Sequence, residues 1–445
     1  MIPLANFTSW FTELDALLVS NRCWWQLQPF HHRQCYWAES EVELTSALMA
    51  LTDEQVTELD ADSEQLAEWI SRWIPEAATL LRLSQLPKAS HKTLLHETLP
   101  HQTLLNQTWP QNAPPARMAE GIPGRKWQQL LAFVEQIPEG QSPALEWCAG
   151  KGHLGRLMSA LQGRPVNSLE WQSKLCAQGE QQALHWGLPQ RFTCADAFSE
   201  SSAQQVQAGE QVMALHACGE LHTSLMRHWG QSIQQQSNSQ QGGQGAKSCT
   251  QPEPSRLSLS PCCYHLIGSE FYEPLSAAAK ASQLRLSRAD LQLPLQQSVT
   301  AGAHVRRRGE QETLWRLAFD ELQRDWRGVD EYLPLPNLKK SLLGGGFEAF
   351  ARWAFEKKSL LEFEERCASL PIGGSLTDEY LARGAERLKL TRRMELVTHL
   401  FRRPLEIWLA LDRVLFLSEQ GAKVSLSTFC EPALTPRNIF IHAER

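Results

Sequence analysis

The chain has 445 residues, of which 42% are hydrophobic and 21% are charged, a composition typical of globular domains. This length is too great for one compact core, so we expect two or three domains. The net charge of −6 excludes a protein that coats nucleic acid non-specifically, and binding to RNA would need local basic patches.

The N-terminal stretch MIPLANFTSWFTELDALLVS has no basic segment and no unbroken apolar core, which argues against a signal peptide. The most apolar run, residues 405–417, contains Glu406, Asp412 and Arg413 and is shorter than the about 20 residues that span a bilayer. Eleven cysteines in a chain without an export signal are typical of reduced thiols. We therefore expect a cytoplasmic protein with no membrane association.

The first part of the chain, residues 1–105, is predicted to be a helical N-terminal domain. Apolar side chains recur there at helical spacing, namely Leu66, Trp69, Ile70, Trp73 and Ile74. A stretch rich in proline and glycine, TWPQNAPPARMAEGIPGRK, then predicts a linker.

Within this first part, two cysteines and two histidines lie close together in the sequence, at Cys23, His31, His32 and Cys35. Their residue types would suit zinc, but their spacing fits no common zinc finger. Because aromatic residues crowd the same stretch, we favour a packing surface over a metal site.

From residue 106 to 284 the pattern changes to short apolar runs that alternate with helical segments. The first three runs end in acids, at Glu146, Glu170 and Asp196, and two more follow as QVMALHACG and RLSLSPCCYH. This alternation predicts βαβ units around a parallel sheet. The polar stretch 231–255, rich in Gln, Ser and Gly, is predicted to be a flexible insertion within it.

The remaining chain is predicted to be a helical insertion over residues 285–418, followed by a C-terminal hairpin over 419–445. In the insertion, Trp315, Phe319, Leu322 and Trp326 form one apolar stripe, which favours a core position over a binding surface. The final hairpin would close the sheet with a long loop around CEPALTPRN.

Glycines open the turn after the first strand, in LEWCAGKGHLGRL, and no GxxxxGK[ST] phosphate-binding motif is present. A carboxylate that ends the second strand, as Glu170 does, is placed to accept hydrogen bonds from both ribose hydroxyls of a nucleoside. Glu146 close to the glycine turn would suit a cationic ligand and disfavour a pyrophosphate. Together these features predict S-adenosylmethionine as the ligand. The alternative is that the acids only cap helices.

Five blocks of the sequence resemble one family of S-adenosylmethionine-dependent methyltransferases. They are EWCAGKGHLGRL, ALHACGELH, SPCCYHL, RPLEIWLALDRVLFLSEQG and TPRNIFIHA. The family includes the methyltransferase-like proteins related to the ribosomal RNA adenine dimethylase domain-containing protein. The first three blocks also resemble the methyltransferase part of the glutathione S-transferase C-terminal domain-containing protein.

The resemblance implies a class I, Rossmann-like methyltransferase sheet of seven strands, with a large helical insertion before its final antiparallel hairpin. It implies a site for S-adenosylmethionine over Glu146, Gly150, Gly152, Glu170 and Asp196. Cys148, His153, Ala197 and His216 are further candidate cofactor-binding residues. The rival from another class is a binding module that keeps this fold without catalysis. The intact acids and glycines argue against it.

A second group of reactive side chains follows the fourth and fifth strands. Its candidate catalytic residues are His216, Cys262, Cys263 and Tyr264. Metal binding by Cys and His and covalent catalysis by one cysteine are both open. We favour a third interpretation without metal, in which the thiols fill space while His216 and Tyr264 shape the acceptor pocket.

The methyl acceptor is expected to be RNA, either tRNA or rRNA, with protein as the alternative. Candidate acceptor contacts are Arg125 and Lys126 before the sheet, and Arg437 and Asn438 in the final hairpin. The run of arginines at 306–308 could also hold phosphate, although a solvated helix end is the favoured interpretation.

Overall fold

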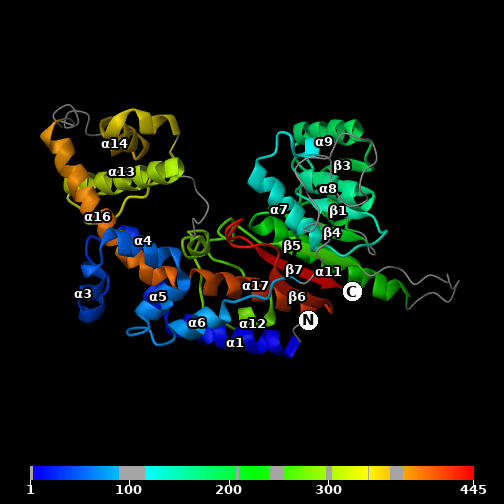
Figure 1. Ribbon diagram of the computed structural model, residues 1–445, viewed down its shortest axis with the longest axis horizontal. Coiled ribbons are helices and arrows are strands. Elements are labelled where there is room, and N and C mark those ends of the chain that lie inside the picture. The colour runs from blue at the N-terminus through cyan, green and yellow to red at the C-terminus, as the bar shows by residue number, and fades with distance from the viewer. Residues whose placement is uncertain are drawn as a thin grey trace. The chain divides into compact units, whose positions relative to one another are not determined.

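A computed structural model describes residues 4–89, 116–206, 210–240, 255–296, 303–338, 340–360 and 374–445 (Figure 1). The chain divides into two compact units. Unit 1 consists of Met1–Ser20, Leu83–Val299 and Arg403–Arg445, and unit 2 consists of Asn21–Arg82 and Thr300–Arg402.

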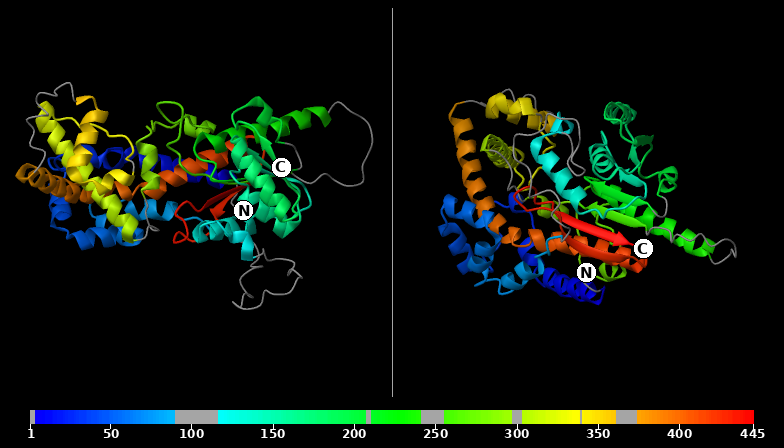
Figure 2. Two further views of the ribbon diagram at one scale, coloured as in Figure 1. Left: turned by 90° about the horizontal axis from the view of Figure 1, so that it is seen from above. Right: turned by 45° about the vertical axis from the view of Figure 1, so that its right-hand side comes forward.

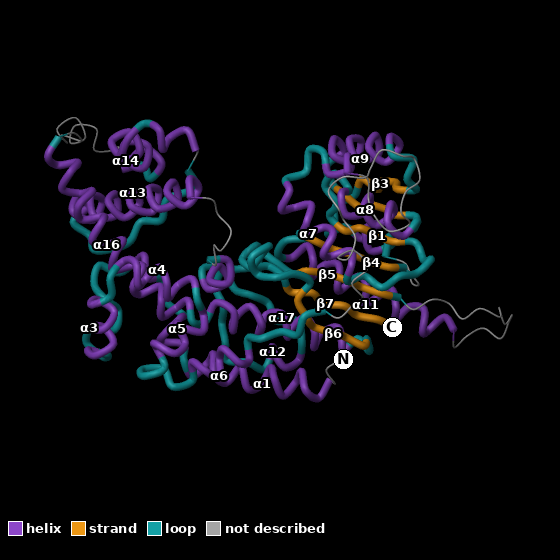
Figure 3. Tube along the Cα trace, viewed as in Figure 1, coloured by secondary structure: helices purple, strands orange, loops and turns teal. Residues whose placement is uncertain are grey.

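Unit 1 is built on a seven-stranded sheet in the order β3-β2-β1-β4-β5-β7-β6, visible as the row of strands in Figure 3. The strands are β1 (Ala144–Trp147), β2 (Val166–Glu170), β3 (Gln190–Cys194), β4 (Gln211–Leu215), β5 (Arg256–Ser260), β6 (Lys423–Thr428) and β7 (Ile439–Glu444). The first five strands pair in parallel, and β7 is antiparallel to both β5 and β6. This order confirms the predicted Rossmann-like methyltransferase sheet with its C-terminal hairpin.

Unit 1 also contains helices that precede, separate and follow these strands along the chain. They are α1 (Leu4–Ser20), α7 (Gly124–Glu135), α8 (His153–Gln162), α9 (Ser173–His185), α10 (Glu200–Ala203), α11 (Glu220–Gln240), α12 (Ala277–Lys280) and most of α17 (Arg402–Glu419), with 3₁₀ turns at Ala116–Ala119 and Asp290–Leu295. Helices α7 and α8 share one apolar core with the sheet, in which Phe133 and Leu157 meet Val166 and Phe440. Burial of this stripe fixes α8, and with it the turn from β1, against the sheet.

The last strand brings distant parts of the chain together. Strand β7 lies directly beside β5, as the further views show where the red C-terminal strand runs next to a green one (Figure 2). Helix α17, which precedes this hairpin, is tied to the loop after β5 by its buried Asp412. That carboxylate accepts hydrogen bonds from the Tyr272 hydroxyl at 2.5 Å, from the Leu275 amide, and from the amide and hydroxyl of Ser276, both at 2.7 Å.

Unit 2 is helical. Its elements are α2 (Arg22–Trp25), a 3₁₀ turn at Pro29–His31, α3 (Val42–Ala50), α4 (Asp53–Ala61), α5 (Ser63–Ile70), α6 (Ala77–Leu83, of which the last residue falls in unit 1), α13 (Ala303–Arg327), a 3₁₀ turn at Lys340–Gly344, α14 (Gly346–Lys357) and α16 (Ser375–His399). Trp315, Phe319 and Leu322 of α13 are buried against the phenylalanines of α14, with Trp326 partly buried beside them, which confirms the predicted core stripe.

The interior of unit 2 also contains charge. Asp320 and Glu321 of α13 are buried and pair with arginines, namely Arg324 and Arg387 for Asp320, and Arg33, Arg383 and Arg387 for Glu321. Buried carboxylates need such partners, because an unpaired charge in this setting is costly. These arginines are therefore committed to the fold of unit 2.

Two sequence-based boundaries differ from the structure. The predicted N-terminal domain of residues 1–105 is not a unit of its own, because α1 belongs to unit 1 and residues 21–82 group with the later helices. Helix α11 continues to Gln240, into the predicted flexible insertion, since glutamine is a good helix former and the helix has already been nucleated. The rest of that insertion, and residues 108–115 of the predicted linker, lie outside the described residues. The remainder of the linker forms the 3₁₀ turn Ala116–Ala119 and the start of α7.

Candidate active site

The predicted acids and glycines meet at the carboxyl edge of the sheet, because parallel strands all end there. Glu170, the last residue of β2, is buried, and its carboxylate accepts the Gly150 amide at 2.9 Å and the Gln172 amide at 3.0 Å. The second strand is thereby tied to the glycine turn after β1. Asp196, which follows β3, is exposed, and its carboxylate accepts the Phe198 amide at 3.0 Å.

The two glycines of the turn serve different ends. Both have a positive φ, 59° at Gly150 and 66° at Gly152. A Cβ added at Gly150 would meet no atom within 4 Å, whereas one at Gly152 would lie 2.4 Å from the Phe192 ring. Gly152 is thus required by packing, and Gly150 leaves open space at the edge where a ligand can approach the backbone.

Glu146 lies beneath the turn and not on its open side, which differs from the predicted contact with a cationic ligand. Its carboxylate is buried, accepts the Ser168 hydroxyl at 2.6 Å, and is further held by the backbone amides of Leu154 and Gly155. It therefore caps the start of α8 and supports the glycine turn from below. Burial raises its pKa to about 7, and the hydrogen bonds only partly offset this.

The raised pKa of Glu146 predicts a pH-dependent stability. The protonated carboxyl is favoured in the folded state, so its stabilisation is complete below the ordinary pKa of 4.5 and is lost as the pH rises through about 7. Glu146 makes the unfolding free energy fall as the pH rises from 5 to 7, and we expect Glu146→Gln to make this negative slope shallower by up to about 1.4 kcal/mol per pH unit. Urea denaturation across this range measures the slope. Glu180→Gln, an exposed carboxylate on α9, is the matched control that should leave it unchanged.

Two further predicted cofactor residues flank the turn as neutral groups. Cys148 has a φ of 56°, and burial together with the nearby carboxylates, Glu170 first among them, raises the pKa of its thiol to about 12. His153, at the start of α8, lies 2.7 Å from Arg156 through its Nδ1 atom, and burial and that guanidinium lower its pKa to about 4. Neither side chain carries a charge near neutral pH.

The turns after β4 and β5 are strained and linked to each other. His216 and Cys263 have φ values of 68° and 52°, a conformation that side chains rarely adopt. The Gly219 amide donates to the Cys262 carbonyl at 3.0 Å, and a Cβ at Gly219 would lie 2.2 Å from the Leu266 carbonyl oxygen. Such strain is found at functional sites, where neighbouring structure enforces it.

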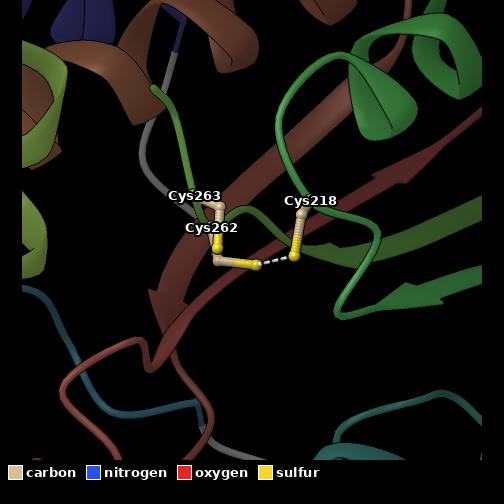
Figure 4. A group of neighbouring side chains, drawn as sticks. All are labelled: Cys218, Cys262 and Cys263. Atoms are coloured by element: carbon tan, nitrogen blue, oxygen red, sulfur yellow. Dashed lines mark hydrogen bonds between the residues drawn. The ribbon is translucent and has the colours of Figure 1, made fainter. Parts of the chain in front are cut away.

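Three thiols converge where these turns meet (Figure 4). The Sγ atoms of Cys218, Cys262 and Cys263 lie within 4.8 Å of one another, with 3.5 Å between Cys218 and Cys262. Among the described residues, this is the group whose ligand atoms are close enough to hold a metal ion. Hydrogen bonds from the other two thiols lower the pKa of Cys263, and the nearby His265 and Arg437 act in the same direction.

Not every predicted site residue faces the open edge. Tyr264 is buried under the Arg413 guanidinium, 4.8 Å from its ring centroid, so it does not line an open acceptor slot as predicted. Asn438 is buried as well, and its amide donates to the Cys430 carbonyl and accepts from Arg403. Both side chains are held in the interior by the packing of α17 and the hairpin, which no local pattern reveals.

The predicted basic residues also differ in their exposure and in the unit to which they belong. Lys126 is exposed, and its charge lowers the pKa of both His153 and His216, which places it beside the site. Arg437 is half-buried and donates to the Leu295 carbonyl at 2.7 Å. Arg125 is exposed. The arginines at 307 and 308 belong to unit 2.

Among the described residues, Cys23, His31, His32 and Cys35 are not found as a group close enough to hold a metal ion. His31 stacks on Tyr332 with 4.2 Å between ring centroids, His32 meets the edge of Tyr36, and Cys23 is exposed. This arrangement agrees with the expected aromatic packing surface.

Comparison with known proteins finds a family model that matches part of unit 1. Residues 125–237 match a family model described as a methyltransferase domain. That segment runs from α7 through the glycine turn and β4 into α11, and therefore covers the acids and glycines described above. Residues 125–237 of unit 1 therefore form a methyltransferase domain.

Two solved structures of methyltransferases resemble this chain, both with low sequence identity and a low TM-score. One is the glycopeptide N-methyltransferase MtfA complexed with S-adenosyl-L-methionine, at 16% identity and a TM-score of 0.21, covering 33% of this chain. The chain spans 58% of that structure. The other is coclaurine N-methyltransferase bound to N-methylheliamine and SAH, at 11% identity and a TM-score of 0.24, covering 90% of this chain and 99% of that one. No curated protein matches.

Two exposed aromatic residues at this edge of the sheet were not among the predicted site residues. Trp171 and Phe198 are exposed aromatic residues, at 70% and 56% of their full surface, and each follows a strand-end acid within two residues. Large exposed aromatic side chains beside a ligand edge are unusual on a free surface. The signal was available, because an aromatic residue stands just beyond each acid.

None of the helices among the described residues combines the length and apolar character needed to cross a bilayer. The expected cytoplasmic location stays a prediction.

Proposed function

We propose that the methyltransferase holds S-adenosylmethionine over the glycine turn, with Glu170 as the principal anchor. The observation that carries this is the position of the Glu170 carboxylate at the end of β2, 2.9 Å from the amide of Gly150. A carboxylate has about four acceptor sites, so two backbone amides leave room for both ribose hydroxyls. The open space at Gly150 admits the cofactor close to the backbone.

The adenine end of the cofactor would lie between the second and third strands. Asp196 is exposed there and can accept the exocyclic amino group, while the rings of Trp171 and Phe198 offer faces for stacking. Cys148, Ala197 and His153 complete the surroundings without adding charge. Glu146 supports the turn and has no direct contact in this arrangement.

The methyl group would then point toward the turns after β4 and β5. Methyl transfer needs an acceptor atom held in line with the bond that breaks, so positioning supplies much of the rate. His216, exposed and strained, is placed to contact either the cofactor or the acceptor. Arg437 and Lys126 lie at the rim of the same region.

RNA is the acceptor that we propose. The support is local: Lys126 is an exposed cation beside the site, and Arg125 is exposed next to it. Phosphate contacts position a nucleic acid, and such cations supply them. The arginines that pair with Asp320 and Glu321 in unit 2 are committed to its fold, so we assign this contact to the cations around the methyltransferase edge. The resemblance to methyltransferase-like proteins with RNA-associated names points the same way.

The RNA hypothesis predicts salt-dependent binding in which Lys126 contacts a phosphate of the RNA. Binding of the full chain to tRNA should weaken as salt rises, and Lys126→Ala should reduce the slope of log affinity against log salt by about 0.7 to 0.9. The matched control is Lys280→Ala, an exposed lysine on α12, which should leave the slope unchanged. Equal slopes in all three proteins would remove Lys126 from the interface.

The acceptor itself is identified by labelling. The full chain is incubated with radiolabelled S-adenosylmethionine and an extract from cells that lack the protein, and the products are treated with RNase or protease. We expect label that RNase releases. Label that survives RNase and disappears with protease would establish a protein acceptor. Cofactor binding with no transfer to either fraction would favour the non-catalytic alternative.

A further inference from the structure

The three thiols at the turns after β4 and β5 have no role in the cofactor site proposed above. Their spacing is that of a metal site. Zinc–sulfur bonds of about 2.3 Å at tetrahedral angles place sulfur atoms about 3.8 Å apart. The Cys218–Cys262 separation is 3.5 Å, and all three Sγ atoms lie within 4.8 Å of one another.

We propose that Cys218, Cys262 and Cys263 bind one zinc ion at the methyl-transfer edge, with the fourth coordination position open. Thiolates are soft ligands, which select zinc over magnesium or calcium. Zinc sites that act on substrates keep three protein ligands and leave the fourth place for water or substrate. Among the described residues, no fourth Cys, His, Asp or Glu atom joins this group.

The surrounding backbone holds the three thiols in place. Cys263 keeps its positive φ of 52°, and the Gly219 amide joins the two turns through the Cys262 carbonyl. Helix α11, which begins at Glu220, is fixed to the second turn because the Glu220 carboxylate accepts the Gly268 amide at 3.0 Å. Cys262 is buried, whereas Cys218 and Cys263 are half-buried, so the group reaches solvent on one side where a fourth ligand can enter.

A zinc ion at this edge would bind the methyl acceptor, an inference that rests on the proposed methyltransferase function. A nitrogen or sulfur atom of the acceptor would occupy the open position and lose its proton to solvent on binding. A lone pair of that atom then forms the bond to the methyl carbon while the carbon–sulfur bond of the sulfonium breaks, and its electrons remain on the sulfur of S-adenosylhomocysteine. The zinc would lower the pKa of the bound acceptor atom and hold it in line.

Metal analysis of the purified full chain tests the site without any assay of transfer. We expect about one zinc per chain after incubation with zinc and removal of the excess. Cys218→Ser, Cys262→Ser and Cys263→Ser should each lose most of it. Cys194→Ser is the matched control, since Cys194 is an exposed thiol at the end of β3, and it should keep the full equivalent. Zinc retained in all three variants would overturn the proposal.

His265→Ala separates an open site from a closed one. His265 follows Cys263 by two residues, but its nitrogen atoms are not part of the group. Retention of the full zinc equivalent in this variant is the expected result. Loss of zinc would show a fourth protein ligand and contradict the open position.

A measurement on the unaltered chain covers the case in which a serine variant does not fold. Iodoacetamide labelling with mass spectrometry should modify Cys218 and Cys263 in the zinc-free protein and spare them after zinc is added, with Cys194 modified in both. Equal labelling with and without zinc would overturn the proposal. A disulfide between Cys218 and Cys262 that is still found after treatment with reductant and then zinc would also overturn it. If the zinc proposal fails in this way and the zinc-free protein still binds S-adenosylmethionine, the proposed cofactor site is unaffected.

Discussion

Replacing Asp412 by alanine is expected to destabilise unit 1 by about 3–5 kcal/mol, the largest effect of a single side chain that the structure predicts. Asp412 is fully buried in α17, and its carboxylate accepts the Leu275 amide, the Ser276 amide and two hydroxyl groups. Alanine would leave these donors buried without a partner. Its neighbour Arg413, which donates to His222 at 2.8 Å and to the Leu409 carbonyl, would lose the adjacent negative charge.

The measurement is urea denaturation of the full chain followed by tryptophan fluorescence. Glu419→Ala is the matched control, because Glu419 lies on the same helix and accepts the Ala277 amide of the same loop, but at the surface. It should cost about 1 kcal/mol or less. If Asp412→Ala costs no more than the control, the buried network does not hold α17 to the loop after β5.

The two glycines of the turn after β1 should respond in opposite ways to alanine. Gly152→Ala adds a Cβ 2.4 Å from the Phe192 ring at a positive φ, and we expect it to destabilise unit 1 by about 2–5 kcal/mol. Gly150→Ala has the same backbone strain without a clash, so it should cost only about 1–2 kcal/mol. Because its methyl group enters the space proposed for the cofactor, it should weaken S-adenosylmethionine binding by about tenfold or more.

Each glycine variant is the control for the other. Thermal unfolding reports the stability of both, and calorimetric titration reports cofactor binding in the one that stays folded. A Gly150→Ala protein that is stable and binds the cofactor as the wild type does would show that the open space beside Gly150 is not the cofactor site.

The sheet could be predicted from the sequence because each strand is marked by local signals. Short apolar runs end in Glu146, Glu170 or a turn, and helices follow them, so the parallel core and the final hairpin were both predicted correctly. The positions of Glu170 and Asp196 at the carboxyl edge follow directly, since strand ends define that edge. The sequence therefore indicated which edge of the sheet these acids share, the edge at which we propose that the cofactor binds.

Features that depend on contacts between distant residues could not be predicted in this way. The burial of Glu146 beneath its own turn depends on Ser168 of the next strand, and the separate roles of Gly150 and Gly152 depend on Phe192. The grouping of residues 21–82 with 300–402 joins segments more than two hundred residues apart. The charges of Asp412 and Arg413 within an apolar helix were a visible anomaly, and the structure explains them as one buried network.

Calorimetric titration of the full chain with S-adenosylmethionine tests the central claim most directly. Wild type should bind about one cofactor per chain, and Glu170→Ala should bind about tenfold to a hundredfold more weakly, the effect of losing charge-assisted hydrogen bonds to the ribose. Glu180→Ala, an exposed carboxylate on α9, should bind as wild type does. Equal affinity in wild type and Glu170→Ala, with both proteins folded, would contradict the assignment of the cofactor to this edge of the sheet.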